Sequence, residues 1–190
     1  MKQIVNYINE RLHITTKSHA RQYTYHPETK KELQKIIIQR IQDNGPDCDL
    51  NDIDVSKITD MSFLFDANEE YMGSAIFKDF NGDISNWDVS NVKYMYNMFA
   101  YCEKFNCDIS DWDVSNVTHM NGMFDKCNEF NCDLSAWDVS NVIYINFMFN
   151  QCNSFKQNLD RWVVTNVKDM WNAFKDCPTQ PKWYKWHNKK

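Results

Sequence analysis

The cysteines are the first residues whose type and spacing could support chemistry. The chain has 7, and most of them recur every 25 residues in two sets. The sets are Cys102, Cys127, Cys152 and Cys177, and Cys107 with Cys132. Such thiols would stack about 5 Å apart, near disulfide range. The sequence has no C-x-x-C pair accompanied by a second C-x-x-C or by H-x-x-x-H, as a zinc site would need. We therefore expect reduced, packing cysteines and no metal.

Aspartates recur with the same spacing. One set comprises Asp88, Asp113 and Asp138, with Asp54 in a weaker copy, and another comprises Asp83, Asp108 and Asp133. We expect the second set to accept hydrogen bonds from turn amides. Carboxylates of the first set, stacked about 5 Å apart, would repel one another unless serine or asparagine, solvent cations or a basic partner relieved them. The first set is therefore a candidate partner-binding stripe, with turn formation and a divalent-cation site as alternatives.

Catalytic motifs are absent from the sequence. It contains no G-x-S-x-G, no phosphate-binding G-x-x-x-x-G-K, no H-E-x-x-H and no G-x-G-x-x-G. The histidines are scattered, and only His119 lies in a repeated segment. A regular row of carboxylates offers no contrast in environment that would separate a general acid from a general base. We expect a protein without enzymatic activity or cofactor.

The spacing of these residues comes from an internal repeat. Similar segments begin at Phe80, Phe105, Phe130 and Phe155, each 25 residues after the last, and a weaker copy begins at Asp49. The weaker copy leaves room for an insertion near residues 68–79. Such periodicity is typical of stacked coils that each contact only their neighbours. The phenylalanines, and the tryptophans at Trp87, Trp112, Trp137 and Trp162, should then stack in the core.

Within a repeat, two apolar patterns succeed each other. Ile84, Trp87 and Val89 have the spacing of a short strand with alternate side chains inward. Apolar residues near helical spacing follow, and these are Val92, Met95, Met98 and Phe99. The sequence therefore predicts an α/β repeat solenoid, similar to leucine-rich repeats, of about five coils over residues 47–177. An asparagine at Asn91, Asn116, Asn141 and Asn166 could satisfy backbone groups along the stack.

These repeats carry a family resemblance. The pattern F-N-x-D-[IL]-S-x-W-D-V-S-N-V-x-x-M-x-x-M-F resembles the repeat of the BspA-like leucine-rich repeat surface proteins, over roughly residues 48–177. The resemblance implies a leucine-rich-repeat-type solenoid that binds proteins or surfaces and has no known catalysis.

Both ends of the chain have cap-like sequences. Residues 1–46 predict a helical cap with apolar helix faces at Ile4, Val5, Ile8 and Leu12, and at Leu33, Ile36, Ile37 and Ile41. The second helix should begin near Pro27 and stop at Gly45-Pro46. Residues 178–190 mix aromatic with basic side chains and should close the last coil. The alternatives are a DNA-contacting helix pair at the first end and a tail for single-stranded nucleic acid or an acidic groove at the second.

Positions that vary between repeats are free for recognition. We expect an exposed aromatic surface formed by Tyr94, Tyr96, Tyr144, Phe147 and Trp171. Aromatic side chains are typical anchors of protein interfaces. The alternative is that these side chains are half-buried rims between adjacent segments.

Charge narrows the class of partner. Residues 1–46 hold 8 basic and 4 acidic residues, residues 47–177 hold 9 and 22, and residues 178–190 hold 4 and 0. The acidic body disfavours direct nucleic-acid binding and favours a protein with a basic surface, or serves solubility. We expect a protein-binding module that is monomeric when free. No membrane span or export signal is evident, so we expect a cytoplasmic location.

Two other functions remain open. One is an intracellular acidic inhibitor, anti-CRISPR-like or anti-restriction, that covers a cationic nucleic-acid channel. The other is a self-assembling module, formed if the caps fail to seal the ends.

Overall fold

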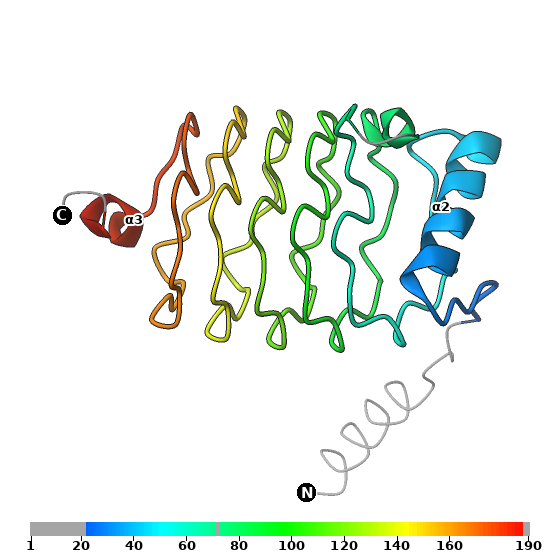
Figure 1. Cartoon of the computed structure of the whole chain (residues 1–190), viewed down its shortest axis with the longest axis horizontal. Helices are drawn as coiled ribbons and strands as arrows, with labels where there is room; N and C mark the ends of the chain where they lie inside the picture. The colour runs from blue at the N-terminus through cyan, green and yellow to red at the C-terminus, as the bar shows by residue number, and fades with distance from the viewer. Residues whose placement is uncertain (1–21, 71–72, 188–190) are drawn as a thin grey trace, which may run out of the picture.

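The computed structural model describes residues 22–70 and 73–187, with side chains through Lys185. Its elements are α2 (Lys30–Asn44), the 3₁₀ helix η1 (Ser74–Phe77) and α3 (Lys182–His187). Figure 1 shows irregular coils side by side between α2 at one end and α3 at the other. The predicted helix face at Ile4–Leu12 lies outside the described residues.

The predicted α/β leucine-rich-repeat-like solenoid is wrong. Across residues 22–70 and 73–187 the extended pairing is limited to isolated parallel bridges, and no β-sheet forms. All three described helices lie outside the 25-residue repeats. The repeats are therefore built of turns, and the fold class and the leucine-rich-repeat and solenoid descriptions inferred from their spacing are corrected accordingly.

The predicted strand fails to form because the chain turns once within it and again at its last residue. The Trp87 N–H donates to the Ile84 carbonyl at 3.1 Å, and the Val92 N–H donates to the Val89 carbonyl at 2.9 Å. Each of these bonds closes a four-residue turn. The inward spacing of the apolar side chains is thus produced by consecutive turns rather than by extended backbone.

The predicted helical turns fail for a different reason. Asn97 and Tyr101 adopt left-handed backbone, with φ of 52° and 63°, which interrupts a right-handed helix. Backbone amides here bond to the next coil: the Asn97 N–H donates to the Asn121 carbonyl and the Phe99 N–H to the Met123 carbonyl, each at 2.9 Å. Amides committed to the next coil are not available for an α-helix.

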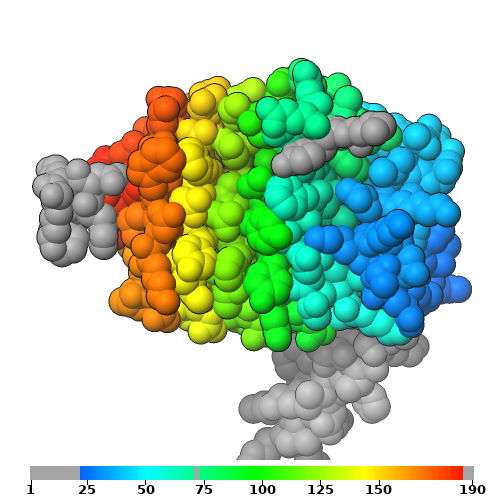
Figure 2. All heavy atoms as spheres, viewed as in Figure 1, coloured from blue at the N-terminus to red at the C-terminus, as the bar shows by residue number. Residues whose placement is uncertain are grey.

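Equivalent residues of successive coils do lie in register. A single chain of parallel bridges joins Asp60, Tyr94, His119, Tyr144 and Asp169. In Figure 2 the coils form parallel bands across the molecule. The expected asparagine ladder is confirmed: the side-chain amides of Asn91, Asn116, Asn141 and Asn166 donate to the Ser56, Ser90, Ser115 and Ser140 carbonyls at 2.7–2.9 Å.

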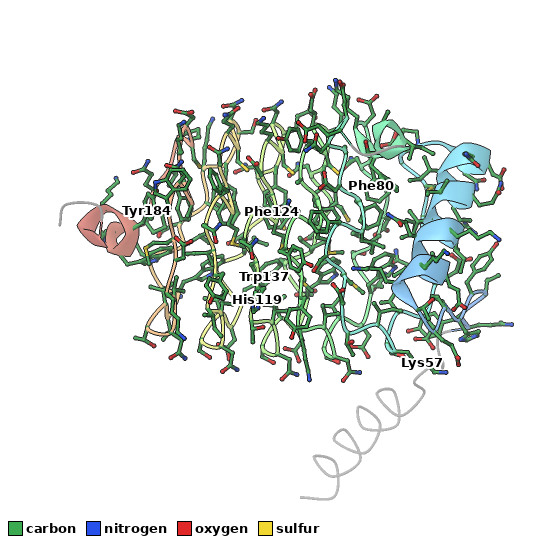
Figure 3. The ribbon with its side chains drawn as sticks, viewed as in Figure 1. Lys57, Phe80, His119, Phe124, Trp137 and Tyr184 are labelled. Carbon is green, nitrogen blue, oxygen red and sulfur yellow. The ribbon has the colours of Figure 1, made fainter. Side chains whose placement is uncertain are left out.

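The core is a double row of aromatic rings. The expected phenylalanine stack is confirmed, with 5.8 Å between the ring centroids of Phe105 and Phe130. Rings from the turn segments interleave with it, so that Phe124 lies 4.1 Å from Phe130. Figure 3 shows the labelled Phe80 and Phe124 among the side chains of the stack. Trp87 and Trp112 stack nearly parallel, with 6.5 Å between centroids.

The buried polar atoms of the core bond from coil to coil. The Trp112 indole N–H donates to the Ile84 carbonyl at 3.2 Å, and the Cys127 thiol donates to the Phe99 carbonyl at 2.9 Å. All seven cysteines are free; Cys107 is half-buried and the others are buried. Burial raises the pKa of Cys127 well above its ordinary value. The prediction of packing cysteines is confirmed for the buried ones.

Residues at each end cover the apolar cross-section of the stack. Helix α2 begins with a capping box formed by Thr29 and Glu32, is followed by Gly45 at its C-cap, and buries Leu33, Ile37 and Ile41. At the other end, the buried Tyr184 of α3 lies 5.1 Å from Phe174. Among the described residues, no helix combines the length and apolar character needed to cross a bilayer.

Candidate functional site

The predicted aspartate stripe forms one set of turns. Each carboxylate accepts the N–H of the serine two residues later. The pairs are Asp54 with Ser56 (3.1 Å), Asp88 with Ser90 (3.1 Å), Asp113 with Ser115 (3.0 Å) and Asp138 with Ser140 (3.0 Å). The second set, Asp83, Asp108 and Asp133, forms the same turns with Ser85, Ser110 and Ser135. The turn role is thus present in both sets, and partner binding by the stripe stays a prediction.

These turns keep the stripe negatively charged. Hydrogen bonds from the following serine lower the pKa of Asp54, Asp113 and Asp138. Since their ordinary pKa is already near 4, these carboxylates are ionised at neutral pH. A line of fixed negative charge therefore runs along this edge of the stack.

A second surface, which we name the aromatic face, is formed by Tyr94, Tyr96, His119, Tyr144, Phe147 and Trp171. Three of its rings follow one another across successive coils. The His119 ring centroid is 5.2 Å from that of Tyr94 and 4.9 Å from that of Tyr144. The Thr118 hydroxyl lies 2.8 Å from His119 Nδ1 and fixes the imidazole. The structure thus joins Tyr94 to Tyr144 through a histidine that the predicted site did not include.

The remaining predicted aromatic residues form two edge-to-face pairs. Phe147 lies 4.8 Å from Trp171, and Tyr96 lies 5.0 Å from Phe63. Between the two pairs, the Asn97 side chain lies against Gly122, which has no side chain of its own. The middle of the aromatic face therefore has no ring pair. Trp171 is 65% exposed and Tyr94 is 41% exposed. The face is therefore partly open and partly a rim between coils, which combines the two alternatives left open by the sequence.

The backbone that presents Phe63 and Phe147 is unusual. Both have left-handed backbone with φ of 59°, and Asn97 and Asn172 at the equivalent positions are also left-handed, with φ of 52° and 54°. This conformation costs an L-residue about 1–2 kcal/mol. Hydrogen bonds between coils hold it, such as the one from the Phe147 N–H to the Trp171 carbonyl at 3.0 Å. The left-handed backbone therefore sets the direction of these two rings, which are half-buried.

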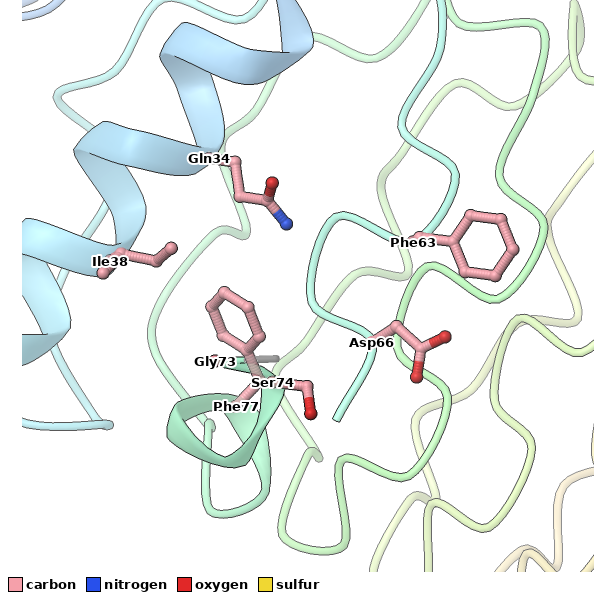
Figure 4. A pocket seen from close by; sticks show the side chains of 7 residues that line it. All are labelled: Gln34, Ile38, Phe63, Asp66, Gly73, Ser74 and Phe77. Carbon is pink, nitrogen blue, oxygen red and sulfur yellow. The ribbon is translucent and has the colours of Figure 1, made fainter. Parts of the chain in front are cut away.

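A pocket that the sequence gave no reason to expect adjoins the aromatic face. We name it the Asp66 pocket; it has a volume of about 410 Å³ (Figure 4). Its lining residues are Gln34, Ile38, Phe63, Asp66, Gly73, Ser74 and Phe77. They come from α2, from η1 in the insertion, and from the turn segment between them. Residues outside the repeat build most of its wall, so the periodicity contained no signal for it.

Asp66 is the charged group of this pocket. It is 5% exposed, and its Oδ1 accepts the Asn68 N–H at 2.8 Å. Its Oδ2 has no hydrogen-bond partner among the residues that the structure describes. Burial raises the pKa of Asp66 to about 6, with a smaller contribution from the Asp125 carboxylate, against the Asn68 bond. Folding therefore works against ionisation of Asp66 at neutral pH.

We expect Asp66→Asn to stabilise the protein at pH 8. Because folding raises the pKa of Asp66, its favourable contribution is complete below about pH 4 and is lost as pH rises through about 6. The amide avoids this loss and still accepts the Asn68 N–H. We expect a gain of about 1–2 kcal/mol at pH 8 and little change at pH 4, measured by urea denaturation.

The control is Asp113→Asn, because hydrogen bonds lower the pKa of that carboxyl. It should weaken the fold slightly at pH 8. A loss of stability in Asp66→Asn that is equal at both pH values would contradict the assignment of a destabilising buried carboxylate.

Comparison with known proteins gives one match. The family described as "Mycoplasma protein of unknown function, DUF285" matches residues 70–186, which contain the four clear repeats and most of α3. Neither the curated proteins nor the solved structures contain a match.

Proposed function

Since the chain belongs to this family of unknown function, we propose from its surface that it binds a protein partner through the aromatic face, without catalysis. The observation that carries the proposal is the row of rings from Tyr94 through His119 to Tyr144, together with the exposed Trp171, which pairs with Phe147. Large side chains rich in aromatic surface supply much of the binding energy in protein interfaces.

The backbone beneath the aromatic face is held by hydrogen bonds between coils, so it would lose little conformational entropy when a partner binds. Alternate amides of each turn segment donate to the next coil, for example Met120 to the Tyr144 carbonyl at 3.0 Å and Phe124 to the Met148 carbonyl at 2.9 Å. A partner would therefore meet side chains on an ordered scaffold. Preorganisation of this kind reduces the entropy cost of association.

Charge supports a partner with a basic surface. The acidic residues of the body outnumber its basic residues by 22 to 9 over residues 47–177. The stripe at Asp88, Asp113 and Asp138 adds a line of carboxylates held by their own turns. Complementary charge accelerates encounter more than it tightens the final complex. The aromatic face would thus supply anchors and the stripe would supply steering.

The test is capture of the partner on the immobilised chain, followed by affinity measurement with variants. We expect Tyr144→Ser with Trp171→Ser to weaken binding at least tenfold, because both anchors are lost. Val163→Ser is the matched control, since Val163 is 55% exposed but lies at the stripe position of its coil. Equal affinity of the double variant and the control would refute the proposal.

The stripe is tested separately. Asp88→Asn, Asp113→Asn and Asp138→Asn together should slow association at low salt while leaving dissociation nearly unchanged, as measured by surface plasmon resonance. Association that is unchanged at low salt would remove the stripe from the mechanism.

The inhibitor and self-assembly alternatives remain predictions. Capture of a nucleic-acid-binding enzyme that is released at high salt would favour an inhibitor. A ladder of sizes in gel filtration that grows with protein concentration would favour assembly.

A further inference from the structure

The last coil, residues 155–177, ends the stack with backbone groups that have no hydrogen-bond partner. In each earlier coil, amides of the turn segment donate to carbonyls of the next coil, as Ile145 does to the Asp169 carbonyl at 3.0 Å. Met170 and Asn172 are the equivalent donors of the last coil. Among the described residues, their N–H groups have no acceptor, and the Lys168 carbonyl has no donor.

These three groups point out of the end of the stack. The turn at Met170 matches the turn at Ile145, since each carbonyl accepts the N–H three residues later at 3.0 Å. Asn172 is left-handed like Phe147, with φ of 54° and 59°. The same backbone geometry directs the free groups to the place that a further coil would occupy. They therefore form the open edge of the parallel pairing that joins the preceding coils.

Helix α3 leaves this edge open (Figure 1). Its Tyr184 ring packs on another part of the last coil, with 5.1 Å between its centroid and that of Phe174. Val164, Val167 and Met170 are partly exposed, whereas the equivalent residues of the preceding coil are at most 2% exposed. Apolar surface and unpaired amides therefore lie together at the end of the stack.

The first coil has the opposite arrangement. Its Ser62 and Leu64 carbonyls lack a preceding coil that could donate to them, and side chains of α2 donate instead. Lys30 Nζ lies 3.2 Å from the Ser62 carbonyl oxygen, and Gln34 Nε2 lies 3.3 Å from that of Leu64. Since these acceptors are occupied, the first coil of a second copy does not offer them to the last coil. The open edge therefore favours a different protein.

The charge of the last coil favours an acidic occupant. Residues 155–185 hold 6 basic and 3 acidic residues, in contrast to the acidic body. Lys168 and Lys175 are exposed, and neither forms an ion pair with a described residue. The neighbouring Asp169 carboxylate accepts the Trp171 N–H at 2.9 Å. An incoming carboxylate would therefore meet lysines that have no competing partner.

We propose that the edge of the last coil binds an extended acidic segment of another protein, which pairs in parallel as one further turn segment. The N–H of its first residue donates to the Lys168 carbonyl. The Met170 and Asn172 N–H groups donate to the carbonyls of its second and fourth residues. Its first residue is acidic and lies beside Lys168, and its third is apolar and packs on Met170. The inference goes beyond the proposed function, because it assigns a second surface that takes the opposite charge.

The test is titration of the full chain at pH 8 with the peptide acetyl-Glu-His-Met-Asn-Gly-amide, followed by NMR. The peptide copies Thr118–Gly122 with glutamate in place of threonine. We expect saturable binding that slows hydrogen exchange of the Met170 and Asn172 amides about fivefold. Met95 and Asn97 should not change, because they already donate to the next coil. No slowing, or equal slowing at all four amides, would overturn the proposal.

N-methylated peptides test the hydrogen bonds. Methylation of the glutamate nitrogen removes the donor to the Lys168 carbonyl and should weaken binding about tenfold. Methylation of the methionine nitrogen is the matched control, because the equivalent Met120 N–H donates away from the preceding coil, to the Tyr144 carbonyl. The control should keep its affinity within about threefold. Equal losses in the two peptides, or equal affinity of a peptide with the reversed sequence, would overturn the proposed pairing.

Two protein variants test the charge. Lys168→Gln should weaken binding of the peptide about threefold at low salt. Lys93→Gln should not, since Lys93 is exposed at the same position three coils earlier. Equal effects would overturn the assignment of an acidic occupant.

A second copy of the chain is the competing occupant. Protection of the Met170 and Asn172 amides that grows with protein concentration, without peptide, would identify it and overturn the proposal. None of these measurements depends on the aromatic face or on the aspartate stripe, so failure here is distinct from failure of the proposed function.

Discussion

Replacing Phe124 with alanine is expected to lower the free energy of unfolding by about 4 kcal/mol. The side chain is 0% exposed and lies at the centre of the ring stack. Its centroid is 4.1 Å from Phe130, 5.5 Å from Phe149 and 5.8 Å from Phe99. Truncation removes these contacts and leaves a cavity that backbone bonds on both sides keep from collapsing. Urea denaturation of the two proteins measures the difference.

Tyr94→Ala is the control for this prediction, because Tyr94 is partly exposed and outside the core. We expect it to cost less than about 1 kcal/mol. Similar losses in the two variants would mean that the ring stack is not the main source of stability.

Gly82→Ala is expected to destabilise the fold by about 2–3 kcal/mol, although alanine is the smallest possible addition. A Cβ atom at Gly82 would lie 2.5 Å from the Cys48 carbonyl oxygen and 2.7 Å from Cε2 of Phe80. Neither neighbour moves freely. The Cys48 oxygen accepts the Asp83 N–H at 3.1 Å, and the Phe80 ring is fully buried.

The matched control is Cys107→Ala, since Cys107 occupies the same position one coil later. A side chain is already accommodated there, so we expect a change below about 1 kcal/mol. Thermal and urea unfolding would measure both variants. A neutral Gly82→Ala variant would show that the first coil approaches the next less closely than the structure shows.

The register of the coils could be predicted, because residues one 25-residue period apart occupy equivalent positions in successive coils. Phe80 and Phe105 differ by one period and stack with 6.1 Å between centroids. Helix α2 was equally predictable, because Gly45-Pro46 ends an amphipathic segment. These features depend on local sequence and on translation by one repeat.

The secondary structure of the coil was not predictable from the same spacing. An apolar pattern such as Val92 to Phe99 cannot tell a helix from successive turns whose amides bond to the neighbouring coil. The left-handed residue Tyr101 gives no warning, because tyrosine rarely adopts that conformation. Backbone hydrogen bonds between neighbouring coils favour the successive turns over the helix.

The candidate site divides in the same way. Repetition identified the aromatic positions and the aspartate stripe, and it also contained His119 in the column of Tyr94 and Tyr144. The Asp66 pocket was not predicted, because most of its wall comes from α2 and the insertion, two segments outside the repeat. Contacts between non-repeating segments leave no periodic signal.

The most direct test of the recognition surface is photo-crosslinking in cells, with p-benzoylphenylalanine placed at Tyr144 or at Ala136. Tyr144 lies on the aromatic face, whereas Ala136 is an exposed residue of the same repeat that does not belong to that face. We predict a discrete crosslinked protein from position 144 and none from position 136. Crosslinks from position 136 alone, or to the same protein from both positions, would contradict the assignment of the aromatic face.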